Sequence, residues 1–200
     1  MNNDDTAVQG KKTPYSGQSP FNAIGFIIQQ ALQNVSTAVP VKVQAVYPSD
    51  TTGYVDVLPL IGTIDGKGEF VKPVTLYHLP YSRIQGGNAA LIIDPVVGDK
   101  GLAIFTDSDS SSVNAESKEP QKPASYRRFS QSDGFYIGGF LNQKPETYIE
   151  LKQDKTTVIN STGGVTINGT VTVIGDVIAD GISLKNHTHT GVHGETSPAH

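Results

Sequence analysis

The feature that most limits the fold is a strictly alternating segment, Val165–Val173. Its apolar residues fall on the odd positions, with Thr, Asn and Gly between them, which is the period of a β-strand with one apolar face. Tyr148–Leu151 and Thr156–Ile159 have the character of earlier strands, and the region is punctuated by Gly163, Gly164, Gly169 and Gly175. A ribbon of about 40 residues with few aromatics cannot bury this face alone, so it needs copies of itself. We therefore predict that residues 141–180 of three chains wind round a common axis as an intertwined trimeric β-helix or β-prism.

Residues 1–37 are predicted to form an arm followed by an amphipathic helix. Residues 1–20 are polar and contain two prolines, which is typical of a flexible arm. From Asn22 to Val35 apolar residues recur at spacings of three and four, namely Ile24, Ile27, Ile28, Ala31, Leu32 and Val35. We expect this helix to cover the end of the next domain; a helix dedicated to a binding partner is the alternative.

Residues 38–140 are predicted to form a small β-domain. Five short apolar runs are separated by turn residues: Val39–Val46, Tyr54–Leu60, Val74–Leu79, Ala89–Ile93 and Gly101–Phe105. A closed barrel of the OB type fits this number of strands, so we predict an N-terminal OB-fold barrel within an all-β chain. The polar segment Ser108–Ser125 is expected to be an exposed loop, and His78 a hydrogen-bonded structural histidine.

Composition argues against several classes of function. The chain has a formal charge of -4 and a pI near 5.7, so it lacks the basic stripe needed for nucleic-acid binding. It has no Cys, which removes disulfides, thiolate zinc sites and cysteine nucleophiles. Its acidic start is unlike a signal peptide, and no run approaches the roughly 20 apolar residues of a membrane span. We expect a soluble chain that is made in the cytoplasm.

The last segment of the chain, residues 181–200, is rich in histidine. His187 and His189 follow the strand-like Ile182–Asn186, and residues i and i+2 of an extended segment point to the same side. One chain offers two imidazoles, fewer than the three or four ligands of a usual zinc site. Around a threefold axis the number becomes six, an octahedral set that suits iron(II) or another transition ion.

The spacing alone is also typical of an adventitious His-rich tail. The pair, however, ends a β-segment and is followed by residues able to fold the chain back over a tip, namely Gly191, Gly194 and Pro198. We therefore predict a metal-binding apex in which His187 and His189 are the ligands of one iron ion per trimer, with zinc or another transition metal as the alternative. His193 and His200 are expected to face solvent.

Three parts of the chain carry a resemblance to a known family: Val55–Leu60 with Pro95–Gly101, then Ser132–Phe135, then Asp180–His189. They resemble the central spike, or membrane-piercing tip, proteins of contractile-tailed bacteriophages, the Mu-like baseplate spikes. The resemblance covers nearly everything after residue 38 and is most specific up to the His-x-His pair. It implies an OB-fold collar that docks on the baseplate hub, a three-chain β-helix, and an apex where His187 and His189 bind iron. Family tips often end in Thr-Gly-Pro-Pro, whereas this chain has Gly194–His200.

The implied function is mechanical: a homotrimer at the tail baseplate tip of the virion, made in the host cytoplasm, that punctures the bacterial outer membrane without catalysis. A tail-associated cell-wall or polysaccharide hydrolase is one alternative, and it needs a positioned acid and base. Asp107, Asp109, Glu116 and Asp133 are expected instead to be solvated loop charges. A metallohydrolase would need a third ligand and a general base, and the nearby acid is Glu195. A receptor-binding fibre, the other alternative, usually ends in a larger recognition domain.

Overall fold

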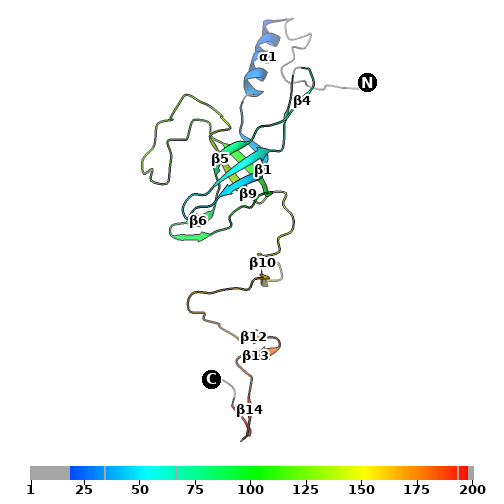
Figure 1. Ribbon diagram of the computed structural model, residues 1–200, viewed down its shortest axis with the longest axis vertical. Helices are drawn as coiled ribbons and strands as arrows, with labels where there is room; N and C mark the ends of the chain where they lie inside the picture. Colours follow the sequence, from blue (N-terminus) through cyan, green and yellow to red (C-terminus); the bar gives the residue numbers. More distant parts are fainter. Residues whose placement is uncertain (1–18, 34, 66, 193, 198–200) are drawn as a thin grey trace, which may run out of the picture. The chain divides into compact units, whose positions relative to one another are not determined.

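The computed structural model describes residues 19–33, 35–65, 67–192 and 194–197, and Figure 1 shows its ribbon. Over these residues the chain has one α-helix and fifteen short strands, so the predicted predominance of β-structure is confirmed. The chain divides into two units, residues 1–143 and 144–200. The boundary predicted between residues 140 and 141 lies close to this division.

Helix α1, Pro20–Gln33, is the predicted amphipathic helix, shifted two residues toward the N-terminus. Ser19 caps it, because the Asn22 amide donates to the Ser19 hydroxyl (3.2 Å), and Pro20 suits the first helical position. The prediction that this helix covers the end of the next domain is wrong for the single chain. Its large apolar side chains are 52 to 84% exposed, namely Phe21, Ile24, Ile27, Ile28 and Leu32. In the part of the chain that the structure describes, no helix has the length and apolar character required to cross a bilayer.

Unit 1 contains a five-stranded antiparallel sheet with the strand order β5-β2-β1-β8-β9. The strands are β1 (Ala38–Tyr47), β2 (Tyr54–Pro59), β5 (Leu76–Pro80), β8 (Lys100–Phe105) and β9 (Gly134–Gly138). Strands β1 and β2 bury their valines on one face, as the period of two requires. The core that results consists of Val41, Val43, Val55, Val57, Leu76, Leu79, Tyr81, Ala103, Phe105 and Tyr136.

The two edges of this sheet bend toward each other. Tyr81, just after β5, forms a parallel bridge with Tyr136 of β9, and the Ser82 amide donates to the Tyr136 carbonyl at 3.0 Å. The sheet therefore curls into a half-barrel around its core. Gly53 permits this packing, because a Cβ atom at that position would overlap the Tyr81 ring.

All five predicted runs form strands, but only four of these strands belong to the five-stranded sheet. The run Ala89–Ile93 yields β7 (Ala89–Leu91), which pairs with β6 (Ile84–Gly86) in a separate hairpin. The fifth strand of the sheet is β9, whose central Tyr136 is 1% exposed. A second small hairpin joins β3 (Thr63–Ile64) to β4 (Phe70–Val71).

Unit 2 contains three two-stranded hairpins: β10 (Tyr148–Leu151) with β11 (Thr157–Asn160), β12 (Ile178–Ala179) with β13 (Ile182–Ser183), and β14 (Thr190–Gly191) with β15 (Gly194–Glu195). The two earlier strands predicted for this region are thus confirmed. The alternating segment Val165–Val173, in contrast, is not a strand within the single chain. A strand needs a hydrogen-bonded partner, and this segment pairs with no other part of the described chain.

Unit 2 has no interior of its own. None of its described residues is buried, and five are half-buried. Thirteen large apolar side chains of this unit are 42 to 100% exposed: Ile149, Leu151, Ile159, Val165, Ile167, Val171, Val173, Ile174, Val177, Ile178, Ile182, Leu184 and Val192. The ten buried hydrophobic residues of the described chain all belong to unit 1.

Candidate metal centre

The residues before the histidine pair form a tight hairpin. Strands β12 and β13 are joined by Asp180 and Gly181, whose φ angles are 50° and 81°. Two consecutive positive φ angles define a type I′ turn, for which Asp-Gly is a preferred sequence. The Leu184 amide then donates to the Val177 carbonyl at 2.8 Å, which carries the hairpin contacts one step further toward the histidines.

Asp176 anchors the turn that follows this hairpin. Its carboxylate accepts hydrogen bonds from the Ser183 hydroxyl and from the Lys185 amide, the latter at 3.0 Å. The hydrogen bond from Ser183 and then the one from Lys185 hold the pKa of Asp176 below its ordinary value. The Ser183 hydroxyl in turn accepts from the Asn186 amide at 2.9 Å. The residue before the pair is therefore tied to a carboxylate ten positions earlier.

The backbone around His187 determines which ring nitrogen is free. Its Nδ1 lies 3.0 Å from the Ser183 carbonyl oxygen and 2.9 Å from the Leu184 carbonyl oxygen. Because carbonyl oxygens only accept, Nδ1 carries the proton, and the lone pair of the neutral ring is on Nε2. A protonated Nδ1 held by backbone carbonyls is the usual arrangement behind a metal-ligating Nε2.

The backbone of His189 is held by Thr196, which follows it in the chain. Its amide donates to the Thr196 hydroxyl at 3.0 Å, and the Thr196 amide donates to the His189 carbonyl at 2.9 Å. Between these contacts the β14–β15 hairpin turns the chain back on itself, as predicted from Gly191 and Gly194. Pro198, His193 and His200, for which we also made predictions, lie outside the described residues.

The two imidazoles lie next to each other. Their ring centroids are 5.0 Å apart and their planes are nearly perpendicular, at 88°. With metal–nitrogen distances of about 2 Å, two imidazoles in neighbouring positions on one ion have centroids roughly 4.5–5 Å apart, so the pair has a suitable separation. Two neutral rings also attract each other in this edge-to-face arrangement. No group of three or more His, Asp or Glu residues that could hold an ion is present within the described part of one chain.

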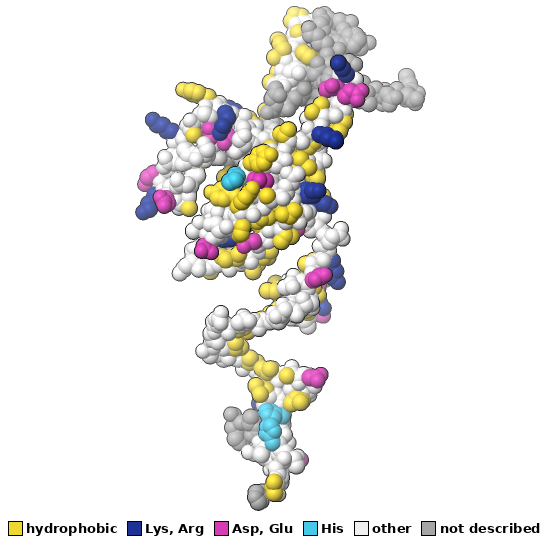
Figure 2. Space-filling model, viewed as in Figure 1, with side chains coloured by type: hydrophobic (Ala, Val, Ile, Leu, Met, Phe, Trp, Pro, Cys, Tyr) yellow, Lys and Arg dark blue, Asp and Glu magenta, His cyan; other side chains and the backbone are white. Residues whose placement is uncertain are grey.

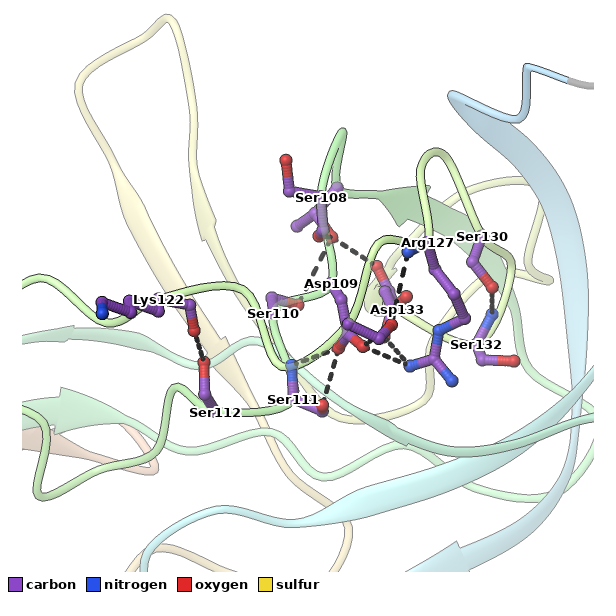
Figure 3. A network of polar contacts seen from close by, with 12 residues as sticks. Ser108, Asp109, Ser110, Ser111, Ser112, Lys122, Arg127, Ser130, Ser132 and Asp133 are labelled. Carbon is purple, nitrogen blue, oxygen red and sulfur yellow. Dashed lines mark hydrogen bonds and ion pairs between the residues drawn. The ribbon is translucent and has the colours of Figure 1, made fainter.

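Four acidic residues considered for a hydrolase lie in unit 1, namely Asp107, Asp109, Glu116 and Asp133, and the expectation that all four are solvated is wrong for two of them. Asp109 and Asp133 are 4% and 5% exposed, and Nη2 of Arg127 lies 3.0 Å from a carboxylate oxygen of each (Figure 3). Hydrogen bonds from the hydroxyls of Ser111 and Ser125 hold the pKa of Asp109 far below its ordinary value. These contacts hold together the loop between β8 and β9, and both carboxylates are ion-paired to the Arg127 guanidinium.

The loop charges Asp107 and Glu116 are exposed, as predicted. His78 has a φ of 55° and an exposed ring that stacks on Tyr47 with centroids 4.9 Å apart. The backbone amide of His78 donates a hydrogen bond to the Asp56 carboxylate at 2.9 Å. The ring Nδ1 lies 3.7 Å from the same carboxylate. His78 therefore lies on the exposed surface of the half-barrel sheet of unit 1.

Sequence reasoning found the two histidines but missed the residues that orient them, Asp176 and Ser183. The Asp180-Gly181 turn was a usable signal for the hairpin that brings them together. Comparison of the chain with known proteins gave no match to any protein-family model and no match to any curated protein.

Proposed function

We propose that the chain is the central spike of a contractile phage tail, a homotrimer that punctures the bacterial outer membrane by mechanical force. The observation that carries the proposal is the absence of any buried residue in the described part of unit 2. Thirteen exposed apolar side chains in such a short region need a partner surface, and the alternating pattern fits copies of the same ribbon.

The finer fold belongs to this proposal. For unit 1 we propose an OB-type barrel, supported by a long β1 that pairs with both β2 and β8 and by the parallel contact that brings β5 and β9 together. For residues 141–180 we propose a three-chain β-prism. Val165, Ile167, Val171 and Val173 are 49 to 63% exposed on one chain and would face the common axis.

The apex follows from the same symmetry. Three copies of His187 and His189 would supply six imidazoles for one transition ion, for which iron is our first choice. The free Nε2 of His187 and the short separation of the rings fit this donor set. When bound, such an ion would link three chain ends at a point too narrow for an apolar core. The ribbon would supply stiffness and the barrel would dock on a baseplate hub protein.

Metal content measured per chain tests the apex. Protein purified without a His tag should contain one transition ion per three chains, and His187→Ala or His189→Ala should abolish it. His78→Ala is the matched control, because His78 is an exposed histidine of unit 1, and it should keep the ion. One ion per chain would favour a metallohydrolase instead, and a metal-free trimer would overturn the proposed apex.

A further inference from the structure

The two histidines of the candidate metal centre are restrained in different ways. The ring of His187 is fixed through Nδ1, which lies 3.0 Å from the Ser183 carbonyl oxygen and 2.9 Å from the Leu184 carbonyl oxygen. The ring of His189 makes no hydrogen bond to any described residue, and its recorded contact is the edge-to-face one with His187. Histidine side chains lie together on the surface of unit 2 (Figure 2). The position of the second ring therefore depends on the backbone that carries it.

The backbone of His189 continues the ladder of the β14–β15 hairpin. The outermost pair of these two strands is Thr190 with Glu195, so His189 and Thr196 are the next opposed residues in the same register. In a regular antiparallel ladder, a hydrogen-bonded pair exchanges two bonds, in which each amide donates to the carbonyl of the opposite residue. One of these two bonds is present, because the Thr196 amide donates to the His189 carbonyl at 2.9 Å.

The second bond of this pair departs from the regular ladder. The His189 amide donates to the Thr196 hydroxyl at 3.0 Å, where a regular ladder would use the Thr196 carbonyl. Ser, Thr, Asn and Asp are the residue types whose short polar side chains bond to nearby backbone in this way. With another residue at this position, the His189 amide would turn either to the carbonyl of the opposite residue or to solvent. Either change would move the backbone of His189 and, with it, the imidazole.

From this geometry we infer that Thr196 is a positioning residue of the metal centre, whose hydroxyl holds the backbone of His189 so that its imidazole stays beside that of His187. This inference rests on the proposed function, since it takes the metal-binding apex as given. The ligands of a metal site bind well when supporting contacts hold them close to the required geometry. His187 has such contacts on its ring, whereas those of His189 come from Thr196.

Four variants separate the hydroxyl of Thr196 from the rest of the residue. Thr196→Val keeps the shape of the side chain and replaces the hydroxyl by a methyl group, and Thr196→Ala removes the hydroxyl with less steric demand. Thr196→Ser keeps the hydroxyl, and all three retain the amide that donates to the His189 carbonyl. Thr156→Val is the matched control, because Thr156 is also an exposed threonine of unit 2 whose hydroxyl makes a hydrogen bond, to Asp154.

Titration of the metal-free, full-length protein with cobalt(II) tests the inference, because the visible absorption of bound cobalt reports both affinity and ligand geometry. Thr196→Val and Thr196→Ala should bind cobalt about 10-fold more weakly than the wild type and with an altered spectrum. Thr196→Ser and Thr156→Val should keep the wild-type affinity and spectrum. The melting temperature and the sedimentation coefficient of every variant should match those of the wild type, because an exposed hydroxyl contributes little to folding stability.

The outcomes separate the inference from the proposed function. Weaker binding by the two hydroxyl-free variants, with recovery in Thr196→Ser, supports the role of Thr196. Unchanged binding by Thr196→Val and Thr196→Ala overturns that role and leaves the metal-binding apex standing, as does an equal loss in Thr196→Ser or in Thr156→Val. Loss of the trimer in both hydroxyl-free variants also overturns it, because Thr196 would then act on assembly instead of on His189. A wild-type protein that binds no cobalt removes both the apex and the inference.

Discussion

Replacing Ile167 by alanine tests whether the apolar face of the ribbon is buried between chains. Ile167 is 63% exposed on the single chain, and this exposed part is what association can bury. Full burial of an isoleucine side chain contributes about 1.5–3 kcal/mol, so association should gain about 1–2 kcal/mol per chain and about 3–6 kcal/mol per trimer. Ile167→Ala removes most of this, and the free energy of trimer dissociation should fall by about 2–5 kcal/mol, roughly 30-fold to several-thousand-fold in the association constant.

The neighbouring residue supplies the control for this measurement. In the proposed ribbon Thr166 would lie on the face opposite to Ile167, so Thr166→Ala should change stability by no more than about 0.5 kcal/mol per chain. The assay is guanidinium denaturation of the full-length protein, followed by circular dichroism and by sedimentation velocity. Equal shifts of the denaturation midpoint for the two variants would refute the reasoning, because they would show that the period of two does not separate an inner face from an outer face.

Three further predictions concern the polar contacts. Asp176→Asn weakens the anchor of the turn before His187, so metal affinity measured by chelator competition should fall about 10- to 100-fold while the trimer persists; an unchanged affinity would remove Asp176 from the apex. The pKa of Asp109 is lower in the folded protein than in the unfolded chain. The Asp109 carboxylate therefore contributes its full stabilisation above the unfolded-state pKa of about 3.9, and this stabilisation is lost as the pH falls below that pKa toward the folded-state pKa. Asp109→Asn should therefore be less stable than the wild type near neutral pH, with the gap in urea midpoint closing in acid, whereas Asp107→Asn, at an exposed site, should follow the wild type; a constant gap would contradict this. Tyr136 is 1% exposed, its hydroxyl has no hydrogen-bond partner among the described residues, and burial raises its pKa to about 12. Tyr136→Phe should leave the melting temperature unchanged or raise stability by about 1 kcal/mol, and a clear loss would reveal a partner for that hydroxyl.

Local patterns predicted most of the elements correctly. The helix followed from apolar spacings of three and four, and the strands of the barrel sheet from short β-branched runs between turns. Strand β9 was missed because Gly134 and Gly138 bound a segment of five residues, although its buried Tyr136 lies between the exposed Phe135 and the half-buried Ile137. The run at Ala89–Ile93 was assigned to the sheet because composition does not distinguish a sheet strand from a projecting hairpin.

Of the candidate site, only the two histidines were predictable from the sequence. The spacing of His187 and His189 was visible in the sequence, but the bond from Ser183 to Asp176 depends on a hairpin that places residues seven positions apart side by side. Likewise, a Ser-rich loop gave no sign that Asp109 would be buried against Arg127, because burial is set by how the loop folds back on the sheet.

The structure of the alternating segment Val165–Val173 cannot be accounted for by one chain alone. Its period predicts a strand, yet within one chain it has no ladder and its apolar side chains are exposed. A strand is stabilised by a partner strand and a covered face, and we propose that both come from other copies of the molecule.

The molecular mass of the untagged protein in solution, measured by sedimentation equilibrium, tests the central claim most directly. One chain has a mass of 21.3 kDa, and the account predicts a single species of three times this mass, about 64 kDa. A folded species of 21.3 kDa, with the ribbon resistant to proteolysis, would contradict it.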